Sequence, residues 1–282
     1  MFSYAGKTAL ITGASSGIGE AFAHILAARG MNLVLVARSA DKLHMLAQEL
    51  SERHGICAEV IPADLCREGA PQEVYRRTQE LGVPVDLLVN NAGFGTFGRF
   101  DTLALEREHE ENMLNVTALV DLTHAFLPAM VERKAGGVIN VASIAAFQAV
   151  PYQAVYGATK AFVLSFSLAL WAEYRKLGVR VVALCPGPTA TNFFTVLGSD
   201  EVPRLGSMHK PEAVVMTGLR ALEQGRPYVV EGRRNAFGAQ VTHMSPLALT
   251  ARVFARVMRP RKQEAQPGGE RSAIPLASRS MP

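Results

Sequence analysis

The sequence alternates between short apolar runs and helix-length segments along most of its 282 residues. The first apolar run, residues 9–11, is followed by a helical pattern that closes at Gly30. The later runs expected to form strands lie at 32–36, 58–62, 85–89, 137–143, 179–184 and 228–230. The expected helices between them lie at about 41–53, 71–81, 112–130 and 211–224, and a further helix carries Tyr156 and is nearly free of charge over 161–172. Strands that alternate with helices in this way form parallel βαβ units, so the pattern predicts an α/β fold with a doubly wound parallel sheet.

We expect a single domain with a short C-terminal extension. The chain has 49% hydrophobic and 19% charged residues, which is typical of a globular protein with a large core. Residues 1–244 contain no linker or internal repeat and are expected to form one Rossmann-type domain. An amphipathic helix is expected at 245–260, where an apolar stripe with Leu249 and Val253 accompanies Arg252 and Arg256. The Pro-, Gly- and Ser-rich segment 261–282 has the composition of a disordered tail.

Charge and cysteine content narrow the class of protein. Five basic and two acidic residues in segment 259–282 account for three of the four net positive charges, so the basicity does not indicate a nucleic-acid-binding face. Cys57, Cys66 and Cys185 lack metal-binding spacing, and we expect reduced thiols and no metal site. No basic region precedes a cleavable apolar segment, and no uncharged apolar run reaches about 18–20 residues. We therefore expect a cytoplasmic protein.

A glycine-rich turn follows the first expected strand. Its candidate phosphate-binding residues are Gly13, Ser15, Ser16, Gly17, Ile18 and Gly19. Between a strand and a helix, such a turn presents backbone N–H groups and the positive helix end to an anion. The spacing G-x-x-x-G-x-G departs from the usual dinucleotide fingerprint, G-x-G-x-x-G. Any tight turn favours glycine, so the turn alone is a weak indication of a nucleotide site.

The residues after the second strand bear on the choice of cofactor. Dinucleotide-binding folds place an acidic side chain there for a free ribose 2′-OH, or an arginine for a 2′-phosphate. In this chain Ala37 occupies the acidic position and Arg38 follows it. The pair favours NADP(H) over NAD(H), and the alternative is that Arg38 is a solvated surface side chain.

Other polar and glycine residues also follow expected strands. They are Asp64 and Leu65 after the third strand, Asn90, Asn91, Ala92 and Gly93 after the fourth, and Ser143 at the end of the fifth. The carboxyl ends of parallel strands share one edge of the sheet, where ligands of such folds bind. We expect these residues to lie together with the glycine-rich turn and Arg38.

Tyr156 and Lys160 are four residues apart in a long apolar stretch. On a helix they would lie on the same face, one turn apart. A phenol has an unperturbed pKa of about 10, and a nearby ammonium lowers it, which would suit the tyrosine for general acid–base chemistry. Such a pair also occurs by chance on many helices, so the surrounding motifs must decide whether this pair is catalytic.

Asn115 lies inside the expected helix at 112–130, near its apolar face. A buried amide costs free energy unless it is hydrogen-bonded. Such local conflicts are often functional, and the alternative is a satisfied core asparagine.

Together these motifs resemble the short-chain dehydrogenase/reductase family in its single-domain form. The matching elements run in order from about residue 5 to 232 and end with Pro186, Gly187 and Thr191 after the sixth strand. Each motif is weak or moderate alone, whereas the ordered set is highly specific. The C-terminal helix and tail lie outside the resemblance.

The resemblance implies a role for each matching residue. Tyr156 would donate a proton to a substrate carbonyl that receives hydride from NADPH, and Lys160 would bind the nicotinamide ribose and lower the tyrosine pKa. Ser143 would bind the carbonyl oxygen, and Asn115 would hold a water of the proton relay. Asp64 would lie at the adenine, and Pro186, Gly187 and Thr191 at the carboxamide. Thr189 stands where the family usually has an aliphatic residue, which leaves that carboxamide contact open.

The expected function is an NADP(H)-dependent oxidoreductase that interconverts a ketone or aldehyde and an alcohol. Two alternatives are a silent NADP(H)-binding regulatory protein, which would not need Ser143, Tyr156 and Lys160, and an epimerase or dehydratase of a related longer family. Aromatic side chains near the expected cleft suggest a lipophilic substrate, although loops of any such sheet carry aromatics: Phe94, Phe97, Phe100, Phe147, Tyr152, Phe193 and Phe194.

Three further expectations concern mobility and partners. The irregular segment 192–210 is typical of a mobile lid. The charge-poor helical segments 161–172 and 116–130 suggest a homodimer or homotetramer. The alternative is that the basic amphipathic helix at the C-terminus covers this surface or contacts a membrane.

Overall fold

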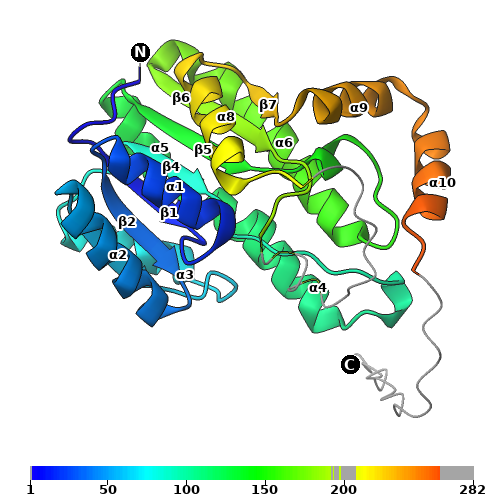
Figure 1. The fold of residues 1–282 in the computed structure, drawn as a ribbon, viewed down its shortest axis with the longest axis horizontal. Helices are drawn as coiled ribbons and strands as arrows, with labels where there is room; N and C mark the ends of the chain where they lie inside the picture. Colours follow the sequence, from blue (N-terminus) through cyan, green and yellow to red (C-terminus); the bar gives the residue numbers. More distant parts are fainter. Residues whose placement is uncertain (1, 192, 194–196, 198–207, 261–282) are drawn as a thin grey trace, which may run out of the picture.

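The computed structural model describes residues 2–191, 193, 197 and 208–260. Within them the chain forms a seven-stranded parallel sheet with the order β3-β2-β1-β4-β5-β6-β7. The strands are β1 Thr8–Thr12, β2 Asn32–Ala37, β3 Ala58–Pro62, β4 Leu87–Asn90, β5 Gly136–Val141, β6 Val179–Cys185 and β7 Tyr228–Val230. This architecture confirms the doubly wound α/β fold expected from the alternation of strands and helices (Figure 1).

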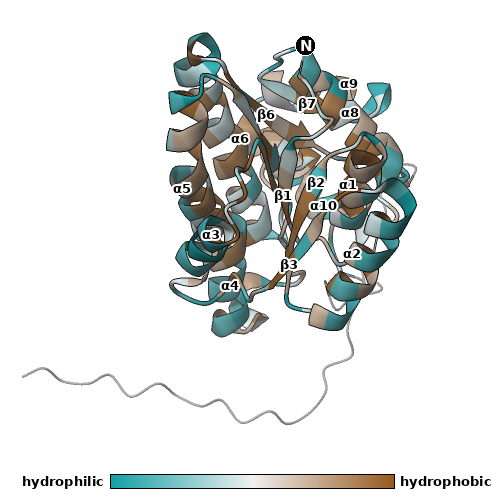
Figure 2. Ribbon diagram, turned by 90° about the vertical axis from the view of Figure 1, so that its left-hand side faces the viewer, coloured by the Kyte–Doolittle hydropathy of each residue, from teal (hydrophilic) through white to brown (hydrophobic). Residues whose placement is uncertain are grey.

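Helices cover both faces of the sheet. The α-helices are α1 Gly17–Ala28, α2 Ala40–His54, α3 Ala70–Glu80, α4 Leu105–Asn112, α5 Ala118–Glu132, α6 Ala154–Tyr174, α8 Pro211–Glu223, α9 Arg233–Met244 and α10 Leu247–Val257. Figure 2 shows the sheet between a layer with α3, α5 and α6 and a layer with α1, α2 and α8. The expected segment 261–282 and most of the expected lid lie outside the described residues.

Side chains of each central strand alternate between the two layers. Ala9 and Ile11 of β1 pack with Phe22 of α1, whereas Leu10 packs with Leu122 of α5 on the opposite face. Because both faces are covered, the central strands are mostly apolar instead of alternating regularly with polar residues. This explains why short continuous apolar runs marked the strands in the sequence.

The strand order reverses between β1 and β4. The connection from β1 leads to β2 on one side, and β4 pairs with β1 on the other. A crevice forms at such a reversal because the connections leave the sheet in opposite directions, and ligands of α/β folds bind there. The glycine-rich turn after β1 and residues 91–93 after β4 therefore meet at one place.

The helix expected at 112–130 has a more complex structure. It comprises the end of α4, a π-helical turn η2 at Met113–Thr117, and α5. Asn115 lies in the π-turn, a rare feature that is frequent at functional sites. Similarly, the expected strand at 137–143 ends at Val141, and Ser143 caps the 3₁₀ helix η3, Ile144–Phe147, by accepting a hydrogen bond from Ala145 N at 3.1 Å.

The sequence did not predict α9. This helix has a single buried hydrophobic residue, Ala239, and exposes Phe237 and Val241, so no apolar stripe marks it in the sequence. The amphipathic helix expected at 245–260 is present as α10. The division into a domain ending at residue 244 and a separate extension stays a prediction.

Two helical segments, Leu105–Glu132 and Ala154–Leu177, are long and apolar enough to cross a membrane by length and composition alone. Both lie beside the sheet and supply buried side chains to the core, such as Leu122, Phe126 and Val163. We therefore assign them as core helices of the α/β sandwich.

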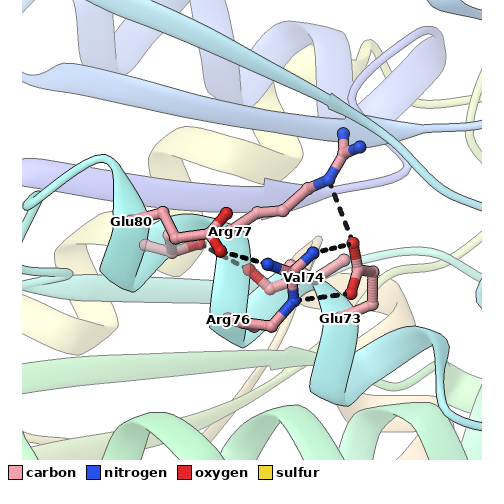
Figure 3. Close-up of polar contacts among 6 residues, drawn as sticks. Glu73, Val74, Arg76, Arg77 and Glu80 are labelled. Carbon is pink, nitrogen blue, oxygen red and sulfur yellow. Dashed lines mark hydrogen bonds and ion pairs between the residues drawn. The ribbon is translucent and has the colours of Figure 1, made fainter.

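Ion pairs on α3 form the network in Figure 3. Glu73 binds the guanidinium groups of Arg76 and Arg77, at 2.7 and 3.1 Å, and Arg76 also binds Glu80. The two arginines lower the pKa of the Glu73 carboxyl. These side chains are exposed, and solvent screens such pairs, so we assign the network to the helix surface rather than to a site.

Candidate active site

A cavity of about 590 Å³ lies at the carboxyl ends of the central strands. Nearly all the site residues expected from the sequence line it: Gly13, Ser15, Ser16, Gly17, Ile18, Arg38, Asp64, Leu65, Asn91, Ala92, Gly93, Ser143, Tyr156, Lys160, Pro186, Gly187, Thr189 and Thr191. Gly19 and Asn115 are exceptions that lie directly behind the lining residues. Asn90, also expected at this edge, is buried instead, and its amide donates to Thr123 and Asn140. The structure therefore brings the dispersed motifs together.

The glycine-rich turn is packed so closely that no side chain fits at Gly13, Gly17 or Gly19 without displacing a neighbour. Gly13 and Gly17 have φ values of +65° and +60°, in the left-handed region that favours glycine. A Cβ on Gly19 would lie 2.2 Å from the Gly13 carbonyl oxygen, so this glycine lets α1 begin directly against the turn. The first turn of α1 thus presents its free N–H groups near the cavity, a geometry suited to a phosphate.

Hydrogen bonds fix this turn to the end of β4. The Asn91 amide donates to the Thr12 carbonyl oxygen at 2.8 Å, and the Thr12 hydroxyl accepts from the backbone N–H groups of Asn91 and Ala92 at 2.9 Å. These bonds span the reversal in strand order, so the two walls of the crevice are held in fixed register. Asn91 therefore shapes the crevice from the side opposite α1.

Arg38 and Asp64 lie at the β2 and β3 end of the cavity. Arg38 directly follows β2, and its exposed side chain reaches the cavity rim. Asp64 accepts a hydrogen bond from the Cys66 backbone N–H at 3.1 Å, which orders the loop after β3. This end of the cavity therefore offers one guanidinium and one carboxylate to a ligand.

Ser143, Tyr156 and Lys160 meet at the opposite end. Lys160 is buried, its Nζ donates to the Val141 carbonyl oxygen at 2.9 Å, and it lies 5.8 Å from the centre of the Tyr156 ring. Tyr156 is half-buried, and its ring packs against Phe193 with centroids 5.4 Å apart. The hydroxyl of Ser143, the phenol and the ammonium thus face one region of the cavity, beside Pro186 and Gly187.

The pKa of Tyr156 shifts in the direction opposite to our expectation. We expected the Lys160 ammonium to lower it, but burial raises the pKa of Tyr156 to about 12, and hydrogen bonding with Ser143 opposes this only in part. Burial also lowers the pKa of Lys160 to about 8, partly offset by the negative charge of Glu111. Removal from water disfavours the charged form of both groups, and it is the largest cause of each shift.

Asn115 holds the segment after β4 against α6. Its side chain donates to the Phe94 carbonyl oxygen at 2.8 Å and to the Thr159 hydroxyl at 3.1 Å, and accepts from Phe94 N at 3.1 Å. The buried amide is therefore fully engaged, which removes the desolvation cost anticipated from the sequence. Through these bonds it sets the position of Gly93 relative to Lys160.

Sequence analysis missed the contributions of α9 and α10 to the cavity. Residues Arg234, Asn235, Gly238, Ala239 and Thr242 of α9, Phe254 of α10 and the following Met258 line it. The Asn235 amide donates to the Glu231 carbonyl oxygen at 2.9 Å and lies beside Gly187, where a Cβ would be 2.2 Å from its nitrogen. In the sequence, only the helical spacing of Phe254 and Met258 indicates that α10 turns an apolar side toward the protein. No comparable spacing marks α9.

Sequence analysis also missed a buried acidic pair behind the site. Glu108 and Glu111 are 5% and 0% exposed, and the Thr96 hydroxyl donates to Glu111 Oε2 at 3.0 Å. Burial raises the pKa of Glu111 to about 7, and the charge of Glu108 adds to the shift. Both residues belong to the acidic sequence 106–111. A sequence so rich in charge is typical of a solvated helix face, so it does not indicate that two of its glutamates are buried.

The amino-acid sequence matches the short chain dehydrogenase family over residues 7–202. The chain is 34% identical to "Oxidoreductase UcpA" of Salmonella typhimurium, covering 77% of this chain and 80% of that protein. It is 35% identical to "17-beta-hydroxysteroid dehydrogenase type 3" of Mus musculus, covering 66% and 61%. The structure is similar to a short-chain dehydrogenase from Sphingobium yanoikuyae in complex with NADPH, with a TM-score of 0.77, 32% identity and coverage of 93% and 99%.

The matched segment contains the glycine-rich turn, both walls of the crevice and the Tyr156–Lys160 pair. Named dehydrogenases and reductases among the relatives act on CH–OH groups or the corresponding carbonyls. The chain belongs to the short-chain dehydrogenase family and is an oxidoreductase of that family.

Proposed function

We propose that the protein is an NADP(H)-dependent oxidoreductase that interconverts a lipophilic ketone or aldehyde and its alcohol. The observation that carries the proposal is the layout of the cavity. A phosphate-compatible turn and Arg38 lie toward one end, and Ser143, Tyr156 and Lys160 lie together at the other.

The residues present fit a dinucleotide. The turn at 13–19 has no room for a side chain at its three glycines, and the N-terminus of α1 suits the pyrophosphate. Arg38 would bind a 2′-phosphate with its fork of N–H donors, which supports NADP(H) over NAD(H). Asp64 would lie at the adenine, and residues 186–191 at the nicotinamide. When bound, the reduced nicotinamide supplies the hydride.

The remaining steps belong to the chain's own side chains. In the reductive direction Tyr156 would donate its phenolic proton to the carbonyl oxygen, and Ser143 would donate a hydrogen bond to that oxygen as negative charge develops. Lys160 would bind the ribose hydroxyls and, as an ammonium, favour the phenolate that remains. The high pKa of Tyr156 suits a proton donor, since the phenol stays protonated at neutral pH.

An apolar cluster beside Tyr156 supports a lipophilic substrate. Ala145, Val150, Leu197 and Met258 form its buried part, and Phe97, Tyr152, Phe193 and Phe254 pack against them. Phe94 also lines the cavity, but Phe100 is 63% exposed and is not in the cavity lining. Phe147 packs against Tyr228, and Phe194 lies outside the described residues. The hydroxysteroid dehydrogenase relative is consistent with a bulky apolar ligand.

We also propose a cytoplasmic homodimer or homotetramer that associates through α5 and α6. The outer face of α6 carries small or apolar exposed residues, including Ala161, Phe162 and Ala169. An obligate interface of this kind buries about 2,000 Å² or more. Light scattering that finds a monomer at micromolar concentration would contradict this part of the proposal.

A panel of ketones and aldehydes, followed by NADPH absorbance, tests the reaction and the substrate class. We expect turnover with bulky apolar carbonyl compounds and weak activity with small polar ones. Turnover limited to polar substrates would refute the lipophilic assignment. NADPH binding without turnover of any carbonyl would instead indicate a regulatory NADP(H)-binding protein.

A further inference from the structure

Exposed apolar side chains concentrate on α9 and α10. Seven of the fifteen large hydrophobic side chains that are exposed in the described part of the chain fall between residues 237 and 257. Phe237, Met244 and Leu247 are more than 70% exposed. A soluble monomer rarely exposes so many apolar side chains on adjoining elements, so this face is a candidate interaction surface.

The exposed residues form stripes on the outer side of each helix. Phe237, Val241 and Met244 follow helical spacing along α9, and Leu249, Val253 and Val257 follow it along α10. The two helices are consecutive in the chain and in contact, at the β7 end of the molecule (Figure 1). We call these six residues with Leu247 the outer apolar face.

Cations accompany this face without any acidic residue. Residues 232–260 contain no Asp or Glu and five arginines, which are Arg233, Arg234, Arg252, Arg256 and Arg259. All five are exposed, and Arg234 also lies at the edge of the cavity. On α10, Arg252 and Arg256 are one residue before Val253 and Val257, so an arginine row runs beside the apolar stripe. An apolar stripe with adjacent arginines is the pattern of a helix that lies in a membrane interface.

The inner side of the same helices lines the cavity. Phe254 and Met258 belong to the apolar cluster around Tyr156, and Ala239 and Thr242 of α9 also line the cavity. Helices α9 and α10 therefore expose the outer apolar face on one side and line the cavity on the other. A single layer of helix lies between that face and the cavity. An apolar ligand released at the outer face would therefore have only a short distance to travel to the cavity.

We propose that the outer apolar face of α9 and α10 docks on the surface of an anionic lipid bilayer. The arginines attract the negative headgroups and the apolar side chains enter the interface. The suggestion that lipophilic substrates reach the cavity directly from the bilayer rests on the proposed function; the docking itself does not.

Two other occupants fit less well. A second copy of the chain paired through this face would place five arginines against the same five, with no acidic residue in the segment to balance them. The phosphates of a nucleic acid would bind the arginines. The seven hydrophobic side chains of the face would then lie against charged phosphates or remain in water, without an apolar partner. Of these three occupants, the anionic bilayer is the one that uses both the arginines and the apolar side chains.

Vesicle flotation of the full chain tests the proposal. We expect the protein to float with phosphatidylcholine–phosphatidylglycerol vesicles, to float weakly with phosphatidylcholine alone, and to dissociate in high salt. Arg252→Glu with Arg256→Glu should lower the partition constant by more than about tenfold, because each charge near the surface contributes appreciably. Leu249→Ser with Val253→Ser should weaken binding in both kinds of vesicle.

Matched controls lie on α2, at the opposite end of the sheet (Figure 1). Lys42→Glu with Arg53→Glu makes the same change in net charge, and Met45→Ser removes an apolar side chain that is 72% exposed. Both should bind vesicles like the wild-type chain. Equal losses in the α2 and α10 charge variants would overturn the proposal, because binding would then depend on net charge alone.

Other results would also overturn it. These are failure of the wild-type chain to float, a change of oligomeric state in the α10 variants by light scattering, or retention of a labelled DNA or RNA in place of vesicles. NADPH turnover of a carbonyl substrate in vesicle-free buffer is measured on the same samples. Activity without flotation refutes docking alone, whereas flotation without activity refutes the proposed reaction alone.

Discussion

The Nζ atom of Lys160 lies 5.8 Å from the centre of the Tyr156 ring while it donates a hydrogen bond to the Val141 carbonyl oxygen at 2.9 Å. The ammonium is thus held on the sheet, beside the phenol but not bonded to it. In the protein alone, burial outweighs this proximity and raises the pKa of Tyr156 to about 12. The relationship makes the roles of the two residues separable by experiment.

Tyr156→Phe should abolish turnover and leave NADPH binding nearly unchanged. Phenylalanine preserves the ring packing against Phe193 but has no proton to donate. General acid catalysis contributes roughly 10²–10⁴-fold, so turnover should fall at least that far. Steady-state kinetics and a fluorescence titration with NADPH measure the two effects. A folded variant with wild-type turnover would show that Tyr156 is only a packed aromatic residue.

NADPH affinity should decrease as the pH rises through about 8. Burial lowers the pKa of Lys160 to about 8, so the side chain is an ammonium below that pH and a neutral amine above it. Its attraction for the bound cofactor is therefore present at lower pH and lost at higher pH. Lys160→Met should remove this inflection and weaken binding throughout. If the same inflection persists in Lys160→Met, another group is responsible.

Arg38→Ala should reduce the preference for NADPH over NADH. Hydrogen bonds to charged groups are worth roughly 1–3 kcal/mol, so the ratio of the two dissociation constants should shrink by up to that amount. The affinity for NADH should change little, since the free 2′-hydroxyl carries no charge. Arg53→Ala, on exposed α2, is the control and should leave the ratio unchanged. Wild-type preference for NADH would contradict the NADP(H) assignment.

Glu111→Gln should stabilise the fold at pH 8 but not below about pH 4.5. Burial raises the pKa of Glu111 from 4.5 to about 7, so ionisation opposes folding. The cost is absent below about 4.5, grows as the pH rises toward 7, and reaches up to about 3 kcal/mol above it. Glutamine resembles the neutral acid and avoids this cost.

Urea unfolding at the two pH values measures the difference. Glu106→Gln, on the exposed side of the same helix, is the control and should change the unfolding free energy little at either pH. A gain in Glu111→Gln that is equal at both pH values would mean that ionisation of the buried carboxyl is not the cause.

The architecture was predictable because the central strands are buried on both faces. Continuous apolar runs such as 32–36 could be recognised without knowledge of their partners, and residues after parallel strands necessarily share an edge. The clustering of the turn at 13–19 with Asn91 and Ser143 followed from that rule, whereas the place of Tyr156, on a helix, was expected from the family resemblance. Gly19 and Asn115 fell just outside the cavity because spacing identifies a segment but not which of its atoms face the ligand.

Three features could not be predicted because they depend on burial in the folded structure: the pKa of Tyr156, the buried acidic pair and helix α9. The rise in the Tyr156 pKa comes from desolvation, which no pair spacing reveals. Glu108 and Glu111 are buried although Glu106 and His109 in the same segment are exposed, and the Thr96 hydroxyl donates a hydrogen bond to the Glu111 carboxyl. Helix α9 packs through a few small residues, such as Ala239, so its sequence lacks an apolar period.

The side chain of Asn115 makes the backbone hydrogen bonds that a neighbouring strand would otherwise make. Its amide donates to the carbonyl oxygen and accepts from the N–H of the same residue, Phe94, as a strand residue would across a β-bridge. Strand β4 ends at Asn90, so the chain leaves the sheet early and no further strand residue completes these bonds. Without the Asn115 amide, the N–H and carbonyl groups of the buried residue Phe94 would lose these bonds, at the cost in free energy of unpaired buried polar groups. The segment after β4, whose residues Gly93 and Phe94 line the cavity, is thus held in place by a side chain of another element rather than by strand pairing.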